Sequence, residues 1–181
     1  MRRIPNCAAA VPATSTARAR CAGLPSFARW LALAALVSLL DQGTKLWVLG
    51  DFHPGEVRAV TDFFNLVLVF NPGAAFSFLA AAGGWQRWFF IVLALGISVW
   101  LVVMIRRHAA ERLLPLALAL VLGGALGNTI DRLYLGAVVD FLDFHVAGRH
   151  WPAFNLADSA IVLGVALMIW HTLTVKENRH D

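Results

Sequence analysis

Residues 113–141 read LLPLALALVLGGALGNTIDRLYLGAVVDF, an apolar run that gives way to charged residues at its end. About 20 mostly apolar residues suffice for a helix to cross the hydrocarbon core of a bilayer. Asp131, Arg132 and Asp140 stand where this run ends. Because charge is costly close to lipid, ionisable residues at that depth point to a functional site. The stretch therefore predicts a membrane-spanning helix with the chemistry at its end.

The composition of the whole chain agrees with a membrane protein. Of its 181 residues, 59% are hydrophobic and 14% are charged, whereas soluble domains have about 25% charged residues. Only helices and closed barrels satisfy their backbone inside a bilayer. We therefore expect an α-helical multi-pass membrane protein with four transmembrane helices. The four stretches that are long and apolar enough, or nearly so, are residues 27–49, 88–105, 113–135 and 152–175.

Basic residues are distributed unevenly between the two sides of this arrangement. The positive-inside rule makes the basic side cytoplasmic, with both termini on it. Most acidic residues fall on the opposite side, which places the expected chemistry at the outer face. The net charge of +4 thus reflects topology and does not indicate a nucleic-acid partner. Ten of the fifteen basic residues share one side: Arg2, Arg3, Arg18, Arg20, Arg29, Arg106, Arg107, Arg112, Lys176 and Arg179.

The two ends of the chain are read as tails of a single membrane domain. Residues 1–26 contain no acidic residue and are expected to be a disordered cytoplasmic tail, with a start codon assigned too early as the open alternative. Residues 27–175 form the four-helix domain, and residues 176–181 a cytoplasmic C-terminal tail. Cys7 and Cys21 provide neither a disulfide framework nor a metal-ligand set.

Residues 50–87, between the first two spans, form the largest hydrophilic segment. They contain TDFFNLVLVFNPGAAFSFL, whose β-branched and aromatic residues and Asn-Pro-Gly turn favour short strands. We expect a small extracytoplasmic β-rich cradle here. Asn71 stands beside Gly73, Ala74 and Ala75, where small side chains leave room for a substrate peptide to add a strand.

Polar residues within the spans are expected to form two groups. Asp41 and Lys45 are four residues apart, so they share a helix face and can form a structural ion pair. Asn128, Asp131 and Arg132 also lie on one face of the third span. Asp131 beside Arg132 is interpreted as a buried clamp, and the planar guanidinium could also hold a carbonyl or head group.

Two acidic residues have no obvious cation beside them. Asp140 is expected in the loop after the third span, and Asp158 one turn into the fourth, with Asn155 on the same face. Two converging carboxylates that are shielded from water should share a proton. Such a pair is the working unit of aspartic proteases. Glycosidases also use paired acids, but a site at membrane level favours a membrane-borne substrate.

Other site chemistries and functions have weaker support. Asp140, Asp143 and His145 could be ligands of a hard metal, but their spacing matches no reliable metal motif, and His145 is interpreted as an exposed loop residue. A small proton-coupled transporter is the main alternative function, because it too would place acids within its spans. A non-enzymatic scaffold would leave the two acids unexplained.

Five blocks carry a resemblance to a known family. They are DQGTK (41–45), NPGAAFSFL (71–79), GNTIDR (127–132), GAVVDFLDF (136–144) and FNLADSAI (154–161). In this order and spacing the chain resembles the lipoprotein signal peptidase family, signal peptidase II, from about residue 27 to residue 172. The resemblance implies a bacterial inner-membrane aspartic endopeptidase with its active site at the periplasmic face. Such an enzyme cuts a prolipoprotein before the cysteine that carries diacylglycerol.

The resemblance also implies roles for individual residues. Implied partners are prolipoproteins with an S-diacylglyceryl cysteine, membrane lipid and globomycin-type inhibitors, and no cofactor, metal or nucleic acid is expected. The long N-terminal tail departs from most members. The implied catalytic pair is Asp140 and Asp158; the residues that contact substrate or inhibitor are Asn71, Asn128, Arg132 and Asn155; and Asp41, Lys45 and Asp131 are supporting residues.

Overall fold

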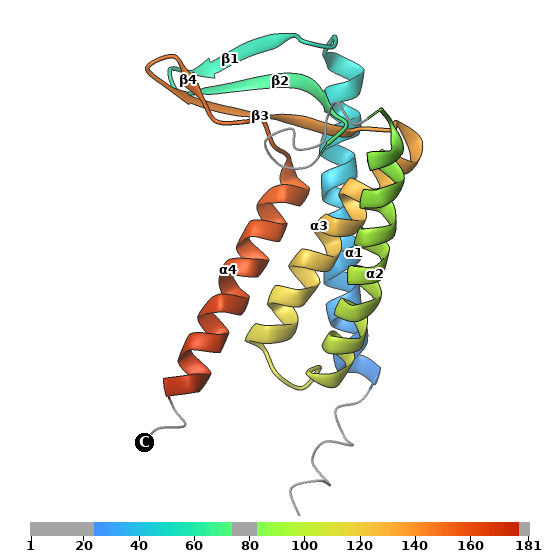
Figure 1. The fold of residues 1–181 in the computed structure, drawn as a ribbon. Coiled ribbons are helices and arrows are strands. Elements are labelled where there is room, and N and C mark those ends of the chain that lie inside the picture. Colours follow the sequence, from blue (N-terminus) through green and yellow to red (C-terminus); the bar gives the residue numbers. More distant parts are fainter. Residues whose placement is uncertain (1–23, 74–82, 178–181) are drawn as a thin grey trace, which may run out of the picture.

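The computed structural model describes residues 24–73 and 83–177, and it contains four long helices with a small sheet across one end (Figure 1). The helices are α1 (Leu24–Asp51), α2 (Trp85–Arg107), α3 (Leu113–Tyr134) and α4 (Leu156–Glu177). The strands are β1 (Val57–Thr61), β2 (Phe64–Asn71), β3 (Val138–Val146) and β4 (Arg149–His150). All four helices are long and apolar enough to cross a membrane. The predicted fold class is confirmed.

The helix boundaries differ from the predicted ones mainly at α4. This helix begins at Leu156, later than the predicted residue 152, because Asn155 caps it. Asn155 Oδ1 accepts a 2.9 Å hydrogen bond from the Asp158 backbone N–H, and Asp158 Oδ2 accepts one of 3.3 Å from the Asn155 N–H. This reciprocal pair forms a capping box. Most of the predicted N-terminal tail lies outside the described residues, as do residues 178–181.

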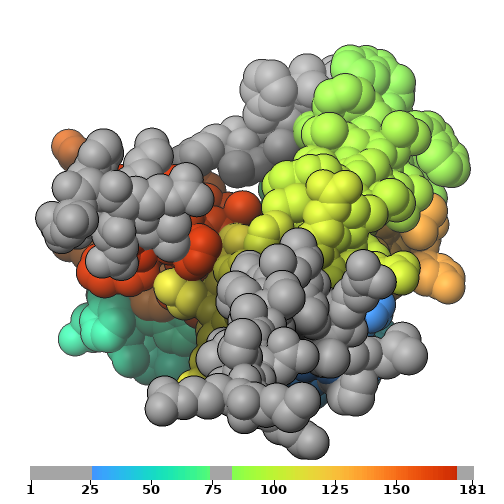
Figure 2. Space-filling view, turned by 90° about the horizontal axis from the view of Figure 1, so that it is seen from below, coloured from blue at the N-terminus to red at the C-terminus, as the bar shows by residue number. Residues whose placement is uncertain are grey.

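Helix α3 lies at the centre of the bundle and packs against α1, α2 and α4. Seen from the end opposite the sheet, α2 and α4 lie on different sides of α3 (Figure 2). Glycines make these approaches close: a Cβ added to Gly123 would lie 2.7 Å from the Ala34 carbonyl oxygen of α1. A Cβ on Gly124 would collide with the Ala157 carbonyl of α4. Small residues at such contacts are typical of helix packing in membranes.

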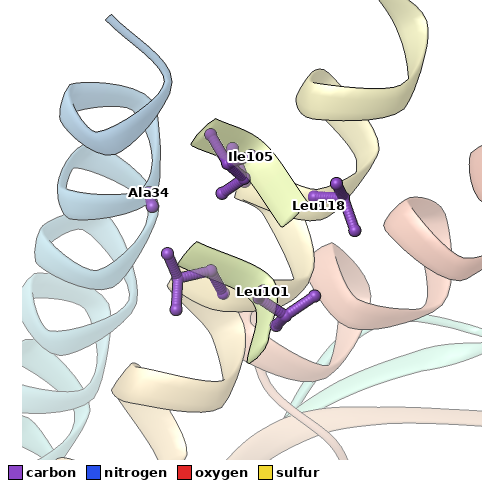
Figure 3. Close-up of a cluster of buried hydrophobic side chains, with 6 residues drawn as sticks. Ala34, Leu101, Ile105 and Leu118 are labelled. Carbon is purple, nitrogen blue, oxygen red and sulfur yellow. The ribbon is translucent and has the colours of Figure 1, made fainter. Parts of the chain in front are cut away.

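The core far from the sheet joins α1, α2 and α3. It includes Ala34, Leu101, Ile105 and Leu118, none of which is more than 2% exposed (Figure 3). By contrast, large apolar side chains such as Trp100, 52% exposed, lie on the outer surface of the helices. An exposed apolar surface of this kind suits contact with lipid and not with water.

The sheet is antiparallel, and its strands run in the order β1-β2-β3-β4. Strands within the 50–87 segment are confirmed, but β3 was missed. Asp140 lies in this inner strand, opposite Val69 of β2, so its predicted place in a loop is wrong. Buried Val48 of α1 and Phe52, directly after that helix, pack against Leu68 of β2 and against β3. This second core attaches the sheet to the end of the bundle.

Candidate active site

Asp140 is brought to the end of the bundle by β3, and its side chain is almost fully buried. Its Oδ1 accepts a 2.7 Å hydrogen bond from Asn155 Nδ2, and its Oδ2 accepts one of 3.1 Å from Asn71 Nδ2. Burial and the nearby Asp158 carboxylate raise the pKa of Asp140 to about 7, against the opposing effect of the two amide donors and of Lys45. Near neutral pH this carboxyl therefore exchanges a proton readily.

Asp158 is the third residue of α4 and lies half-buried. Its Oδ1 accepts a 2.8 Å hydrogen bond from Asn128 Nδ2, and the Asn155 backbone N–H donates to its Oδ2. Negative charge is favoured at the N-terminus of a helix. Asn155 is thus bonded to both acids, through its side chain to Asp140 and through its backbone to Asp158. Within the described residues neither acid forms an ion pair.

Lys45 of α1 is the centre of a buried network behind this pair of acids. Its Nζ lies 2.8 Å from Asp41 Oδ2 and 2.8 Å from Asp131 Oδ2, and it donates a 2.9 Å hydrogen bond to Asn128 Oδ1. An ammonium group has three donor hydrogens, so these contacts use them all. The predicted pair of Asp41 and Lys45 forms. Because Lys45 occupies the Asn128 oxygen, the amide NH₂ of Asn128 is left for Asp158.

Asp131 and Arg132 do not form the expected clamp with each other, although Asp131 does hold the chain that follows the helix. Asp131 pairs with Lys45, and its Oδ2 accepts a 3.0 Å hydrogen bond from the Val139 N–H, directly before Asp140. Neighbouring residues on a helix point in different directions and do not face each other. Sequence reasoning also missed Gln42, which donates a 2.8 Å hydrogen bond to Asp131 Oδ1. One indication of this role is present in the sequence: Gln42 lies three residues before Lys45 in the same helix.

Arg132 points to the sheet. Its Nη2 donates a 2.8 Å hydrogen bond to the Gly73 carbonyl, and its guanidinium lies 5.1 Å from the centroid of the Phe90 ring. Asn71 Oδ1 accepts a 3.0 Å hydrogen bond from the Gly73 N–H. Arg132 Nε is buried and has no hydrogen-bond partner within the part of the chain that the structure describes. Residues 74 and 75, expected to make room for a peptide, lie outside the described residues.

A separate polar cluster lies farther along the sheet. Asp143 accepts a 2.8 Å hydrogen bond from Asn65 Nδ2 and pairs with His150 Nδ1 at 2.9 Å. Burial alone would raise the pKa of Asp143, but these two partners outweigh it and lower the pKa. His145 lies in β3, with its ring 4.9 Å from the His150 ring, so its predicted loop position is wrong. No cluster suited to a metal occurs within residues 24–73 and 83–177.

The geometry suits chemistry on a bond that needs both an acid and a base. One carboxyl holds a proton near neutral pH, and the other lies at a helix N-terminus that favours its charge. Such a pair can activate water and polarise a carbonyl at the same time. Comparison with known proteins shows which group this chain belongs to. Residues 33–174 match the family model described as signal peptidase (SPase) II. The chain belongs to the signal peptidase II family.

Relatives of this signal peptidase II family member are similar over most of their length. The lipoprotein signal peptidase of Azoarcus sp. (strain BH72) is 60% identical over 152 residues, covering 84% of this chain and 86% of the relative. The lipoprotein signal peptidase of Burkholderia mallei (strain SAVP1) is 55% identical over 148 residues, covering 82% and 89%.

The fold also resembles that of a solved bacterial membrane enzyme. A bacterial membrane enzyme of known structure superposes with a TM-score of 0.75 at 33% identity, covering 83% of this chain and 91% of the other. The protein is therefore a multi-pass membrane peptidase of the signal peptidase II family. The transporter considered as an alternative is not supported by these relatives.

Proposed function

We propose that this protein is an aspartic endopeptidase that removes signal peptides from prolipoproteins, cutting before the cysteine that carries diacylglycerol. One observation supports the aspartic mechanism: Asp140 and Asp158 both accept hydrogen bonds from Asn155, and neither forms an ion pair among the described residues. The relatives named lipoprotein signal peptidases support the substrate class.

The surroundings of the two acids suggest different roles for them. Asp158 is the base, because Asn128, the Asn155 N–H and the start of α4 all favour its negative charge. Asp140 is the acid, because burial and the charge of Asp158 raise its pKa to about 7. One proton shared between two acids is the expected state of such a pair.

In the proposed reaction, the Asp158 carboxylate takes a proton from a water molecule whose oxygen attacks the scissile carbonyl carbon. Asp140 gives its proton to the carbonyl oxygen, and a neutral tetrahedral diol results. Asp158 then protonates the leaving amine, while Asp140 takes a proton back from one hydroxyl as the C–N bond breaks. Both acids return to their starting states, so one water is consumed for each bond cut.

The amides around the acids are proposed to hold the substrate backbone. Asn71 and Arg132 meet at Gly73, where the chain leaves the sheet, and Arg132 Nε is still available as a donor within the described residues. Asn128 of α3 and Asn155, the cap of α4, support the acids. Globomycin-type inhibitors are expected to occupy the same place, since they are implied for the family.

The proposed setting is the bacterial inner membrane, with the site at the periplasmic face and both termini in the cytoplasm. The sheet lies at one end of the bundle, and the α2–α3 connection lies at the other (Figure 1). Arg106, Arg107 and Arg112 flank that connection, which supports a cytoplasmic position for it. A lipid-anchored substrate in the outer leaflet would bring its cleavage site to the depth of Asp140.

One assay tests the proposal. The purified protein is incubated with a prolipoprotein whose cysteine carries diacylglycerol, and with the same prolipoprotein lacking the lipid. Release of the intact signal peptide from the lipidated form, measured by mass, is expected. Cleavage that requires an added divalent ion, or equal cleavage of the unlipidated form, would contradict the proposed mechanism or substrate.

A further inference from the structure

Arg87 joins the outer ends of two helices beside the candidate site, although nothing in the sequence marked it. It is the third residue of α2. Its Nη2 donates a 2.7 Å hydrogen bond to the Leu133 carbonyl in the last turn of α3. Its guanidinium also lies 5.1 Å from the centroid of the neighbouring Trp88 ring. These contacts hold the cation at the C-terminal end of a helix to which it does not belong.

The Leu133 carbonyl needs a donor from elsewhere. The last four carbonyls of a helix have no hydrogen-bond donor within the helix. In α3 the Leu135 N–H, just after the helix, donates to one of them, the Asp131 carbonyl, at 2.7 Å, and not to Leu133. A cation near these carbonyls is favourable, because the C-terminal end of a helix carries partial negative charge. Arg87 therefore caps α3 from the neighbouring helix.

The capped turn leads directly to the strand that carries Asp140. Gly136 has a φ of 80°, and a Cβ added to it would lie 3.5 Å from Arg87 Nη1. Strand β3 begins two residues later, at Val138. After this turn, the Val139 N–H donates a 3.0 Å hydrogen bond to the Asp131 carboxylate. The link from α3 to β3 is thus held at both ends. Arg87 bonds to Leu133 at its start, and Asp131 bonds to Val139 at its end.

We propose that Arg87 is a positioning residue for Asp140: by capping α3 from α2, it fixes the turn that carries this carboxyl to its partner. Its contacts within the described residues are to Leu133, Trp88 and the region of Gly136, so it acts on the reaction through the backbone. The inference rests on the proposed function, because it gives Arg87 a role only through Asp140.

Loss of the cap should change the reaction step more than substrate binding. Asp140 would leave the position set by Asn155, and small misplacements of a reacting group lower kcat by about 10- to 100-fold. The groups that face Asp140 are Asn71 of β2, Asn155, Asp158 of α4 and Lys45 of α1. Loss of the Asn155 hydrogen bond would raise the pKa of Asp140. Greater contact with water and a greater distance from Asp158 would lower it, and they act on the two largest effects. The alkaline limb of the activity profile would then move to lower pH.

The experiment compares full-length Arg87→Ala, Arg87→Lys and Arg107→Ala with the unsubstituted protein in the cleavage assay, and records kcat, KM and the pH profile. Arg107 lies in the last turn of the same helix and is exposed, so it controls for loss of an arginine from α2. Arg87→Ala should lower kcat by at least about 10-fold at similar KM and shift the alkaline limb. Arg87→Lys should recover part of the activity, because an ammonium can donate one hydrogen bond to Leu133.

Two results would overturn the inference while leaving the proposed function intact. One is Arg87→Ala with an unchanged kcat and pH profile; the other is a fall in activity without a shift of the alkaline limb. If Arg87→Ala does not accumulate in the membrane, Gly136→Ala strains the same turn through its positive φ and must produce the same shift. Failure of the unsubstituted protein to cleave would overturn the proposed function, and this inference with it.

Discussion

Asn155 Nδ2 donates a 2.7 Å hydrogen bond to Asp140 Oδ1, so the residue that caps the start of helix α4 also holds the carboxyl on strand β3. Asn155 is fully buried, and its own side-chain oxygen is used by the Asp158 N–H. The start of the helix and the position of the acid on the strand therefore depend on one another. This relationship makes the candidate site testable by substitutions both inside and outside it.

Removal of either acid should abolish cleavage without unfolding the protein. Asp140→Asn and Asp158→Asn each take away half of a proton-sharing pair, and the rate should fall by about 10²- to 10⁴-fold or more. Asp143→Asn is the matched control, because this acid lies in the same strand but bonds to Asn65 and His150. Substantial activity in either of the first two variants, with intact thermal unfolding, would remove that residue from the proposed pair.

The raised pKa of Asp140 should make the protein less stable as the pH rises. The unfolded chain loses this proton near the ordinary value of 3.8, whereas the folded chain keeps it up to about 7. Between these values the folded state binds more protons, so stability falls with increasing pH. Asp140→Asn has no proton to lose and should be more stable than the unsubstituted protein at pH 8, by up to about 4 kcal/mol.

Thermal unfolding in detergent between pH 4 and pH 8 measures this difference. The advantage of Asp140→Asn should shrink towards pH 4, because there the unfolded chain also begins to bind this proton, as the folded chain already does. Parallel stability curves for the two proteins across this range would show that the Asp140 carboxyl is not perturbed.

Lys45→Met should be strongly destabilising. Asp41 and Asp131 would remain buried without their shared cation, and removing one partner of a buried ion pair costs about 3–5 kcal/mol. Adding Asp41→Asn and Asp131→Asn to the same chain removes the uncompensated charges and should restore much of the unfolding temperature. A triple variant no more stable than Lys45→Met alone would contradict the charge-based explanation.

Two glycine substitutions should have opposite effects. Gly96→Ala places a methyl group where nothing lies within 4 Å, so it should keep or raise stability, by up to about 1 kcal/mol from helix propensity. Gly124→Ala puts a methyl group against the Ala157 backbone and must push α4 away from α3. Because Asp158 follows Ala157, cleavage should fall together with the unfolding temperature. Equal behaviour of the two variants would exclude the close contact.

Single cysteines test which side of the membrane the sheet occupies. Ala59 on β1 and Ala110 between α2 and α3 are both exposed, whereas Ala109 is buried. With Cys7 and Cys21 replaced, a cysteine at position 59 should react with an impermeant thiol reagent from the periplasmic side, and one at position 110 should not. The reverse pattern would invert the proposed topology.

Much of the fold could be predicted because the bilayer makes simple demands. A spanning helix needs a long apolar run, and four such runs are visible in the sequence. The pair of Asp41 and Lys45 could be predicted from spacing alone, since it lies within one helix. The second acidic partner of Lys45, Asp131, could not, because it belongs to another helix and meets Lys45 only when α1 and α3 pack.

Strand β3 was missed for a similar reason. Its pairing with β2 joins residues that are far apart in the chain, such as Asn71 and Val138, and no local turn connects them. The assignment of Asp131 to Arg132 failed because adjacency in sequence was taken for contact. Arg87 escaped notice because a carbonyl at a helix end, unlike a charged side chain, leaves no mark in the sequence.

The site draws on the first and the last helix at once, since the Ala157 N–H donates a 2.8 Å hydrogen bond to Asp41 Oδ1. A nascent chain with three helices inserted holds Asp140 but has neither Asp158 nor the Asn155 bridge. On the proposed mechanism, the peptidase is therefore inactive throughout its own synthesis. Proteolysis can begin only after the ribosome has delivered the fourth helix and that helix has docked, so that biogenesis itself delays the onset of cleavage.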